Sequence, residues 1–309
     1  MQVCHVWVVV EQTSMLCNEK DGAGRTKTYL TLLELNYMVR DNCLPQYFAP
    51  FRISFPERTP IGLSAFLFCL ALPAGAAPTA DIVILGEVHD NPHAHLEQAA
   101  ALETLHPTAV VFEMLTAEQG AKADADRSQI AQTWTASGWQ EFDIYAPIFD
   151  AMGAARIIGA AAPREAVRAV YRDGAAALFG REAGRFGLDQ PLPDIEQAAR
   201  IEVQFTAHCE AMPREMLGGM VEVQRYRDAT FARAALDALK LYGPPVAVIT
   251  GNGHARTDWG IPALIALAAP EVTTHAIGFV EARGAAPYDE THIIPPAKRE
   301  DPCKSLIKD

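Results

Sequence analysis

Short apolar runs rich in β-branched residues recur along residues 81–280, and each is bounded by turn residues. Runs of this kind are typical of strands that are buried on both faces of a parallel sheet. The stretches between them show helical patterning. This alternation predicts an α/β fold, with a largely parallel sheet flanked by helices. The predicted strands are 81–86, 109–113, 156–160, 246–250 and 274–280, and the predicted helices are 93–106, 117–132, 142–153, 164–177, 194–210, 213–241 and 259–268.

Residues 160–245 read as almost purely helical. They predict a helical insertion or subdomain that caps one end of the sheet. Residues 1–55 show no sustained period of 2 or 3.6, so no element is predicted there.

The longest apolar run, Ile61–Leu72, is twelve residues long. It is too short to cross a bilayer, which takes roughly 20 apolar residues, but it has the length of a signal-peptide core. Arg58 precedes it, and Ala74-Gly75-Ala76 follows as a small-x-small cleavage site. We therefore expect residues 1–76 to be a leader, made of a mis-assigned start or atypical extension plus a signal peptide, and residues 77–309 to be a single domain. The alternative is a buried helix of an N-terminal domain.

Charge separates the same two parts of the chain. Residues 1–76 hold six acidic and six basic side chains, so the net charge of −12 belongs to residues 77–309. An acidic domain argues against nucleic-acid binding, which needs a basic face. The 50% hydrophobic and 21% charged composition excludes a disordered chain.

The positions of the cysteines are compatible with export. Phe68 before Cys69 is a poor context for a lipid-anchored cysteine, so a soluble exported, periplasmic protein is expected rather than a lipoprotein. Cys209 and Cys303 are the two cysteines of the predicted domain, and one disulfide between them is possible in an oxidising compartment. The other four cysteines, Cys4, Cys17, Cys43 and Cys69, precede the predicted domain.

Polar side chains collect where three predicted strands end. Glu87 and His89 follow the first strand, Glu113 follows the second, and His254 follows the strand at 246–250. Ligands of open α/β sheets bind beyond the carboxyl ends of the strands. If these strands are neighbours, two imidazoles and two carboxylates converge. That set suits general acid–base catalysis, a metal site or the edge of a cofactor pocket, although each residue alone could be structural.

A second pattern lies in the helical stretch. His208, Met212, Met216 and Met220 are spaced by four, which on a helix makes one stripe, although Pro213 may divide it between two helices. The stripe is either ordinary core or a soft apolar wall for a porphyrin with an imidazole at one end.

Six segments of the chain carry a family resemblance. They are ILGEVHDNPHAH (84–95), VVFEML (110–115), GWQEFDIYAPIFDA (138–151), AHCEAMP (207–213), MVEVQRYRDATFA (220–232) and GNGHARTDWGIP (251–262). Together they resemble the ChaN-type haem-binding family of bacterial exported proteins and lipoproteins. The resemblance implies an α/β fold shared with erythromycin esterases, haem binding connected with iron acquisition, and haem at a homodimer interface. Tyr226 stands where the family more often has an aliphatic residue.

The resemblance leaves the iron ligand open. His208 is the first candidate because it heads the methionine stripe, and Tyr145 is the second, with His89 and His254 behind them. Arg227 and Arg256 are candidates for the haem propionates, since a dianionic ligand needs local cations on an acidic protein.

Three hypotheses about function follow. The first is an exported haem carrier that works with haem-uptake components. The second is a periplasmic hydrolase in which Glu87, His89, Glu113 and His254 act on an ester, with or without a metal. The third is a partner-binding module in which both Gly-x-x-His motifs are scaffolding.

Overall fold

The computed structural model describes residues 15–20, 26–31, 79–139 and 141–305. The chain divides into two compact units, Met1–Cys69 and Leu70–Asp309. In the first unit, β1 (Met15–Lys20) pairs antiparallel with β2 (Thr26–Thr31). No element was expected here, and that expectation was wrong, because the apolar residues of each strand are adjacent rather than alternating. The predicted signal-peptide core and cleavage site at 61–76 lie outside the described residues.

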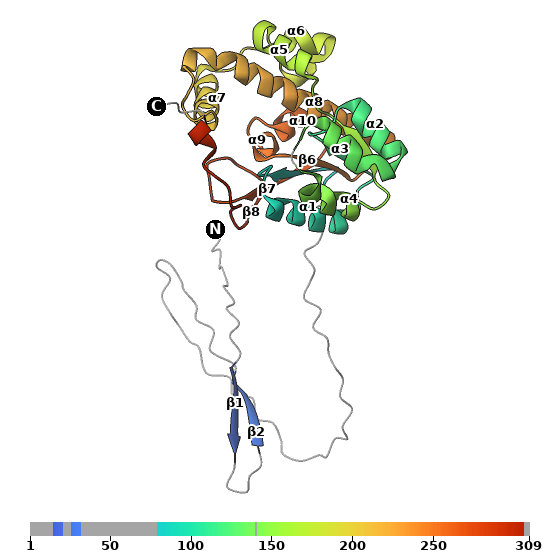
Figure 1. Ribbon diagram of the computed structural model, residues 1–309, viewed down its shortest axis with the longest axis vertical. Helices are drawn as coiled ribbons and strands as arrows, with labels where there is room; N and C mark the ends of the chain where they lie inside the picture. The colour runs from blue at the N-terminus through green and yellow to red at the C-terminus, as the bar shows by residue number, and fades with distance from the viewer. Residues whose placement is uncertain (1–14, 21–25, 32–78, 140, 306–309) are drawn as a thin grey trace, which may run out of the picture. The chain divides into compact units, whose positions relative to one another are not determined.

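The second unit is built on a six-stranded sheet in which every pairing is parallel, as predicted (Figure 1). Its order is β5-β4-β6-β3-β7-β8, so the three strands whose ends carry the polar residues are neighbours, with β6 between β4 and β3. The strand β8 was not predicted, because it is short and mostly exposed. The strands are β3 (Ile82–Glu87), β4 (Ala109–Phe112), β5 (Arg156–Gly159), β6 (Val246–Gly251), β7 (Thr274–Val280) and β8 (Glu290–Ile293).

The strands read as continuous apolar runs because both faces of the sheet are covered. In β3, Ile82 and Ile84 join one core while Val83 and Leu85 join the other. Figure 1 shows α1 and α4 on one side of the sheet and α8, α9 and α10 on the other. The helices are α1 (Pro92–Leu105), α2 (Ala117–Ala125), α3 (Ile130–Ser137), α4 (Phe142–Ala151), α5 (Arg164–Asp173), α6 (Ala175–Phe179), α7 (Asp194–Ala207), α8 (Gly218–Tyr242), α9 (Asn252–Ala255) and α10 (Ile261–Ala268), with 3₁₀ turns η1 (Arg127–Gln129), η2 (Gly180–Phe186), η3 (Arg214–Met216) and η4 (Pro302–Ser305).

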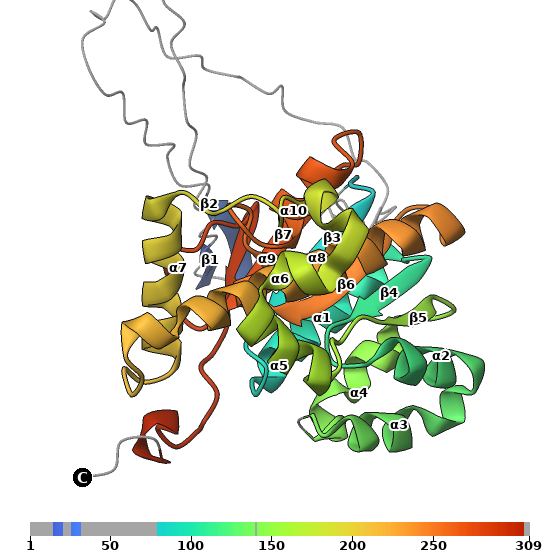
Figure 2. The same cartoon turned by 90° about the horizontal axis from the view of Figure 1, so that it is seen from above.

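The helical insertion between β5 and β6 is confirmed, but it does not simply cap one end of the sheet. Its longest helix, α8, packs on β4, β5 and β6, and its buried side chains Phe231 and Ala232 belong to one of the two main cores. The helices α5 and α6 lie beyond α8 (Figure 1), and α7 lies to one side of them, packed against α8 (Figure 2). The insertion therefore supplies most of one helical layer.

No helix among the described residues is long and apolar enough to cross a membrane.

Candidate functional site

The first polar group at the sheet edge is centred on Glu87, which ends β3 and is buried. Its Oε1 atom accepts hydrogen bonds from the Tyr145 hydroxyl at 2.6 Å and from His89 Nδ1 at 2.7 Å. The Tyr145 hydroxyl in turn accepts from the Trp139 indole at 3.1 Å. Burial alone would raise the pKa of Glu87, but the hydrogen bond from His89 and the nearby imidazole of His95 outweigh it, so the pKa is lowered. Glu87 is thus an ionised anchor that orients the imidazole of His89.

His95 belongs to the same group, although its sequence position suggested only the start of a helix. It is fully buried on α1, and its Nδ1–H donates to the Ile144 carbonyl at 3.0 Å. Its Nε2 lies 3.6 Å from Glu87 Oε2, and neither atom has a hydrogen-bond partner. His95 therefore faces the carboxylate oxygen of Glu87 that does not bond His89.

The second polar group lies at the ends of β4 and β6. The Oε2 atom of Glu113 accepts from the Thr250 hydroxyl at 2.7 Å and from the Gly251 amide at 2.8 Å. His254 Nδ1 bonds Asp228 Oδ1 at 2.6 Å, and His254 Nε2 faces Glu113 Oε1 at 3.6 Å. Burial by itself would lower the pKa of His254, but the charges of Glu113 and Asp228 prevail and raise it.

The glycines of the two Gly-x-x-His motifs, 86–89 and 251–254, allow the two motifs to pack closely against each other. A Cβ on Gly86 would lie 2.4 Å from Asn252 Oδ1 and 2.9 Å from the Cβ of Ala255, both in the second motif's helix α9. A Cβ on Gly251 would lie 2.7 Å from His89 Nε2 in the first motif. Each glycine therefore makes room for the other motif, which brings both imidazoles to one edge of the sheet.

These groups form the floor of a cavity of about 560 Å³, which we call the acid–base chamber. Gln224, Arg227 and Asp228 of α8 line it, as do Trp139 and Trp259. No pattern in the sequence marked the contribution of α7, since Arg200 and Gln204 are ordinary polar residues of a helical stretch. The lining residues are Glu87, Val88, His89, Glu113, Trp139, Arg200, Val203, Gln204, Ala207, Val221, Gln224, Arg227, Asp228, Gly251, Asn252, Gly253, His254, Arg256 and Trp259.

The chamber is equipped for proton transfer. His89 and His254 each have a carboxylate on Nδ1, which fixes the ring and leaves Nε2 for chemistry. Burial would lower the pKa of His89, but Glu87 and Glu113 raise it. Two oriented imidazoles beside one cavity can serve as a base and an acid. Among the described residues, no group of three or more His, Cys, Asp or Glu side chains is arranged to hold a metal ion.

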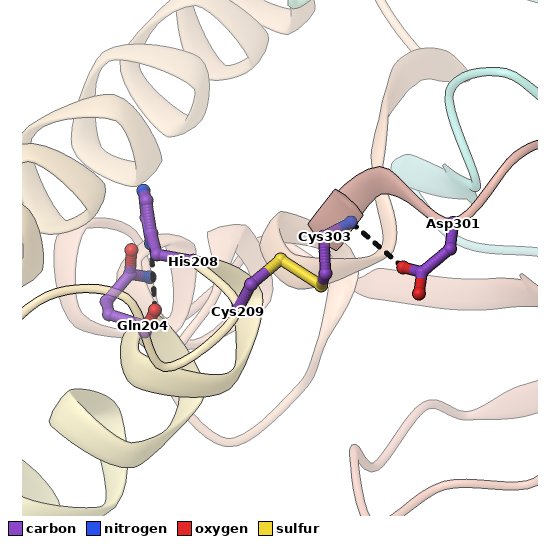
Figure 3. Close-up of a disulfide and its surroundings, with 5 residues drawn as sticks. All are labelled: Gln204, His208, Cys209, Asp301 and Cys303. Carbon is purple, nitrogen blue, oxygen red and sulfur yellow. Dashed lines mark hydrogen bonds between the residues drawn. A yellow bond between two sulfur atoms is a disulfide. The ribbon is translucent and has the colours of Figure 1, made fainter. Parts of the chain in front are cut away.

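The second cavity, about 530 Å³, contains His208, and we call it the His208 cavity. It shares Gln224 and Arg227 with the acid–base chamber. His208 Nδ1–H donates to the Gln204 carbonyl at 2.8 Å, so Nε2 carries the free lone pair (Figure 3). Tyr171, Arg168 and Arg172 on α5 were not predicted to belong to a site, because nothing in one sequence shows that α5 packs beside α8. The lining residues are Val167, Arg168, Tyr171, Arg172, His208, Met220, Val223, Gln224 and Arg227.

The structure separates residues that the sequence grouped. α7 ends at Ala207 and α8 begins at Gly218, so His208 and the three methionines do not form one helical stripe. Of the methionines, Met220 lines the His208 cavity, whereas Met216 is half exposed in η3.

Two other haem candidates lie elsewhere. Tyr145 is fully buried, and its hydroxyl bonds Glu87, so the structure does not bring it together with His208. Arg256 lines the acid–base chamber, where it is ion-paired with Asp258 at 2.6 Å and lies over the Trp259 ring.

Comparison with known proteins gives one family. The model of the haem-binding uptake family, Tiki superfamily, ChaN, matches residues 74–265. The solved structure of cofacial haem binding to ChaN of Campylobacter jejuni shares the fold with a TM-score of 0.52 and 20% sequence identity, over 68% of this chain and 84% of that one.

Two further solved structures have TM-scores of only 0.32. The type III effector HopBA1 is 15% identical over 65% of this chain and 77% of its own, and a succinoglycan biosynthesis protein is 11% identical over 64% and 65%. No curated protein matches the chain significantly.

Proposed function

We propose that this chain, which belongs to the ChaN family of haem-binding uptake proteins, is an exported protein that binds haem in the His208 cavity. The observation that carries the proposal is the tautomer of His208. A histidine that ligates a metal usually donates its other ring N–H to a backbone carbonyl or a carboxylate. His208 already makes that bond, to the Gln204 carbonyl.

The other residues of the cavity fit a porphyrin with two propionates. Val167, Val223 and Met220 give it an apolar wall. Arg168 and Arg227 form no ion pair with an acidic side chain in the described part of the chain, so they are free to bind carboxylates. Bound haem would supply the iron centre, and His208, Tyr171 and Met220 are the side chains in this cavity of a type that ligates haem iron.

Export and assembly complete the proposal. The leader-like residues 1–76 and the disulfide between Cys209 and Cys303 support an exported location, because structural disulfides persist in oxidising compartments. The homodimer with haem at its interface and the haem-uptake components as partners remain proposals that rest on the family resemblance. Sedimentation with and without haemin tests the dimer.

Haemin titration followed by the Soret band tests the cavity. We expect wild type to shift the band and His208→Ala to bind at least about tenfold more weakly. His292→Ala, an exposed histidine on β8, is the matched control and should bind like wild type. No Soret shift in wild type would reject haem binding, whereas equal binding by His208→Ala would reject this cavity.

The acid–base chamber supports a second candidate function, ester hydrolysis. With neutral His89 Nε2 as base, water loses a proton and its oxygen bonds the acyl carbon. Protonated His254 then gives its proton to the departing alkoxide, so that acid and alcohol leave. Arg227, which also borders this chamber, would stabilise the oxyanion.

An ester and lactone panel at several pH values tests this second function. Two oriented histidines predict a bell-shaped rate profile, and loss of at least about a hundredfold in rate in His89→Ala. The control is again His292→Ala. Activity that survives both His89→Ala and Glu87→Ala would show that the chamber is not the catalytic site.

A further inference from the structure

The helix α7 forms one wall of the acid–base chamber but is weakly anchored to the protein. Of its fourteen residues only Arg200 and Gln204 are buried, and both are polar. It packs mainly against α8 and η3. Ile195 and Val203 on this helix are exposed, at 87% and 43%. A helix that buries so little apolar surface gains little from packing and belongs to the least stable part of a fold.

One contact holds α7 across the chamber. The Arg200 guanidinium lies over the Trp259 ring, 5.1 Å from its centroid, and Glu196 on the same helix orients it at 2.6 Å. Trp259 follows α9 in the sequence, and both Trp259 and Arg200 line the chamber. A single cation–π contact contributes little free energy, so this contact can break and form again readily.

A disulfide bond links the residues that follow the C-terminal end of α7 to the C-terminal part of the chain. Cys209, two residues after the helix, is bonded to Cys303, 94 positions away (Figure 3). We call residues 295–303 the C-terminal strap. The strap also contacts the edge of the chamber. Arg299 donates hydrogen bonds to both carboxylate oxygens of Asp90, at 2.6 and 2.8 Å, and Asp90 follows His89 directly.

Glu281 also forms hydrogen bonds with the strap. It accepts from Arg299 at 2.6 and 2.8 Å, from the Ala297 amide at 2.9 Å and from Asn91 at 2.7 Å. The strap therefore runs from the loop that carries His89 to the loop that follows α7.

We propose that α7 is a lid over the acid–base chamber and that the Cys209–Cys303 disulfide keeps it closed. Reduction by a dithiol adds two electrons and two protons to give two thiols, and the dithiol becomes a disulfide. The strap then stays on Asp90 while α7 is released. Oxidising surroundings close the lid and reducing surroundings free it. This inference does not depend on which ligand the chamber or the His208 cavity takes.

Hydrogen exchange on the full chain tests the lid. We compare oxidised wild type with the Cys209→Ser/Cys303→Ser variant, both without reductant. Amides of α7 should exchange at least about fivefold faster in the variant, while those of α1 keep their rates. Carbethoxylation of His254 should also accelerate relative to exposed His292, because the lid no longer covers the chamber.

Reductant supplies the matched control. It should reproduce the fast exchange of α7 in wild type and change nothing in the double variant, which retains the four N-terminal cysteines. Equal α7 exchange with and without the disulfide would overturn the proposal. So would equal acceleration of α1 and α7, because the disulfide would then stabilise the whole domain rather than a lid.

Discussion

Glu113 connects the two histidines of the acid–base chamber electrostatically. Burial alone would raise its pKa, but His254, His89 and the hydrogen bonds from Gly251 and Thr250 lower it to about 2. A carboxyl group whose folded pKa is depressed stabilises the fold above its unfolded pKa, here 4.5. That contribution is lost as the pH falls from 4.5 towards 2. Glu113 is therefore a fixed charge at neutral pH, and the titrating groups of the chamber are its imidazoles.

Replacing this charge should change the pKa values of the two histidines more than it changes the stability of the fold. Glu113→Gln keeps an oxygen that can accept from Thr250 and Gly251 but removes the negative charge facing His254. We expect the pKa of His254 to fall and that of His89 to fall less, as measured by NMR titration of the imidazole protons. An unchanged pKa of His254 would show that Asp228 alone sets it. Thr250→Val, which retains the charge, is the control.

At the scale of elements, the site depends on how closely α9 approaches β3. The register places Glu87 opposite Gly251, so both Gly-x-x-His turns leave the sheet at the same level. The helix α9 then lies against Gly86 so closely that a methyl group has no room. The motif glycines are thus packing residues between elements rather than flexible hinges.

Gly86→Ala should destabilise the domain. The added Cβ would meet Asn252, Ala255 and the Ile277 carbonyl, and such overpacking costs about 1–3 kcal/mol. Gly253→Ala is the matched control, because a Cβ there meets nothing within 4 Å and alanine favours the helix α9. Urea unfolding measures both. A Gly86→Ala variant as stable as Gly253→Ala would contradict the close packing of α9 on β3.

At the scale of the whole molecule, features that depend on residues close together in the sequence were predictable, and features that depend on distant residues were not. The strands β3 to β7 were predicted to within about two residues, because burial on both faces leaves apolar runs. Convergence of the strand-end residues was conditional on strand order, which a single sequence does not contain. The Asp228–His254 and Arg299–Asp90 pairs join residues 26 and 209 positions apart, and no local pattern marks them. Pro213 signalled the break in the methionine stripe, but not where each part would go.

The same view of the molecule predicts that residues 77–309 fold without the preceding segment. Both main cores consist of residues between Ala80 and Ile294, and the described contacts of the two cavities stay within that range. A chain beginning at Ala77 should therefore melt within about 2 °C of the full-length chain, followed by circular dichroism under oxidising conditions. Its haemin affinity should equal that of the full chain. A melting temperature lower by several degrees would instead make residues 1–76 part of the fold, because only packing against the domain could account for that loss.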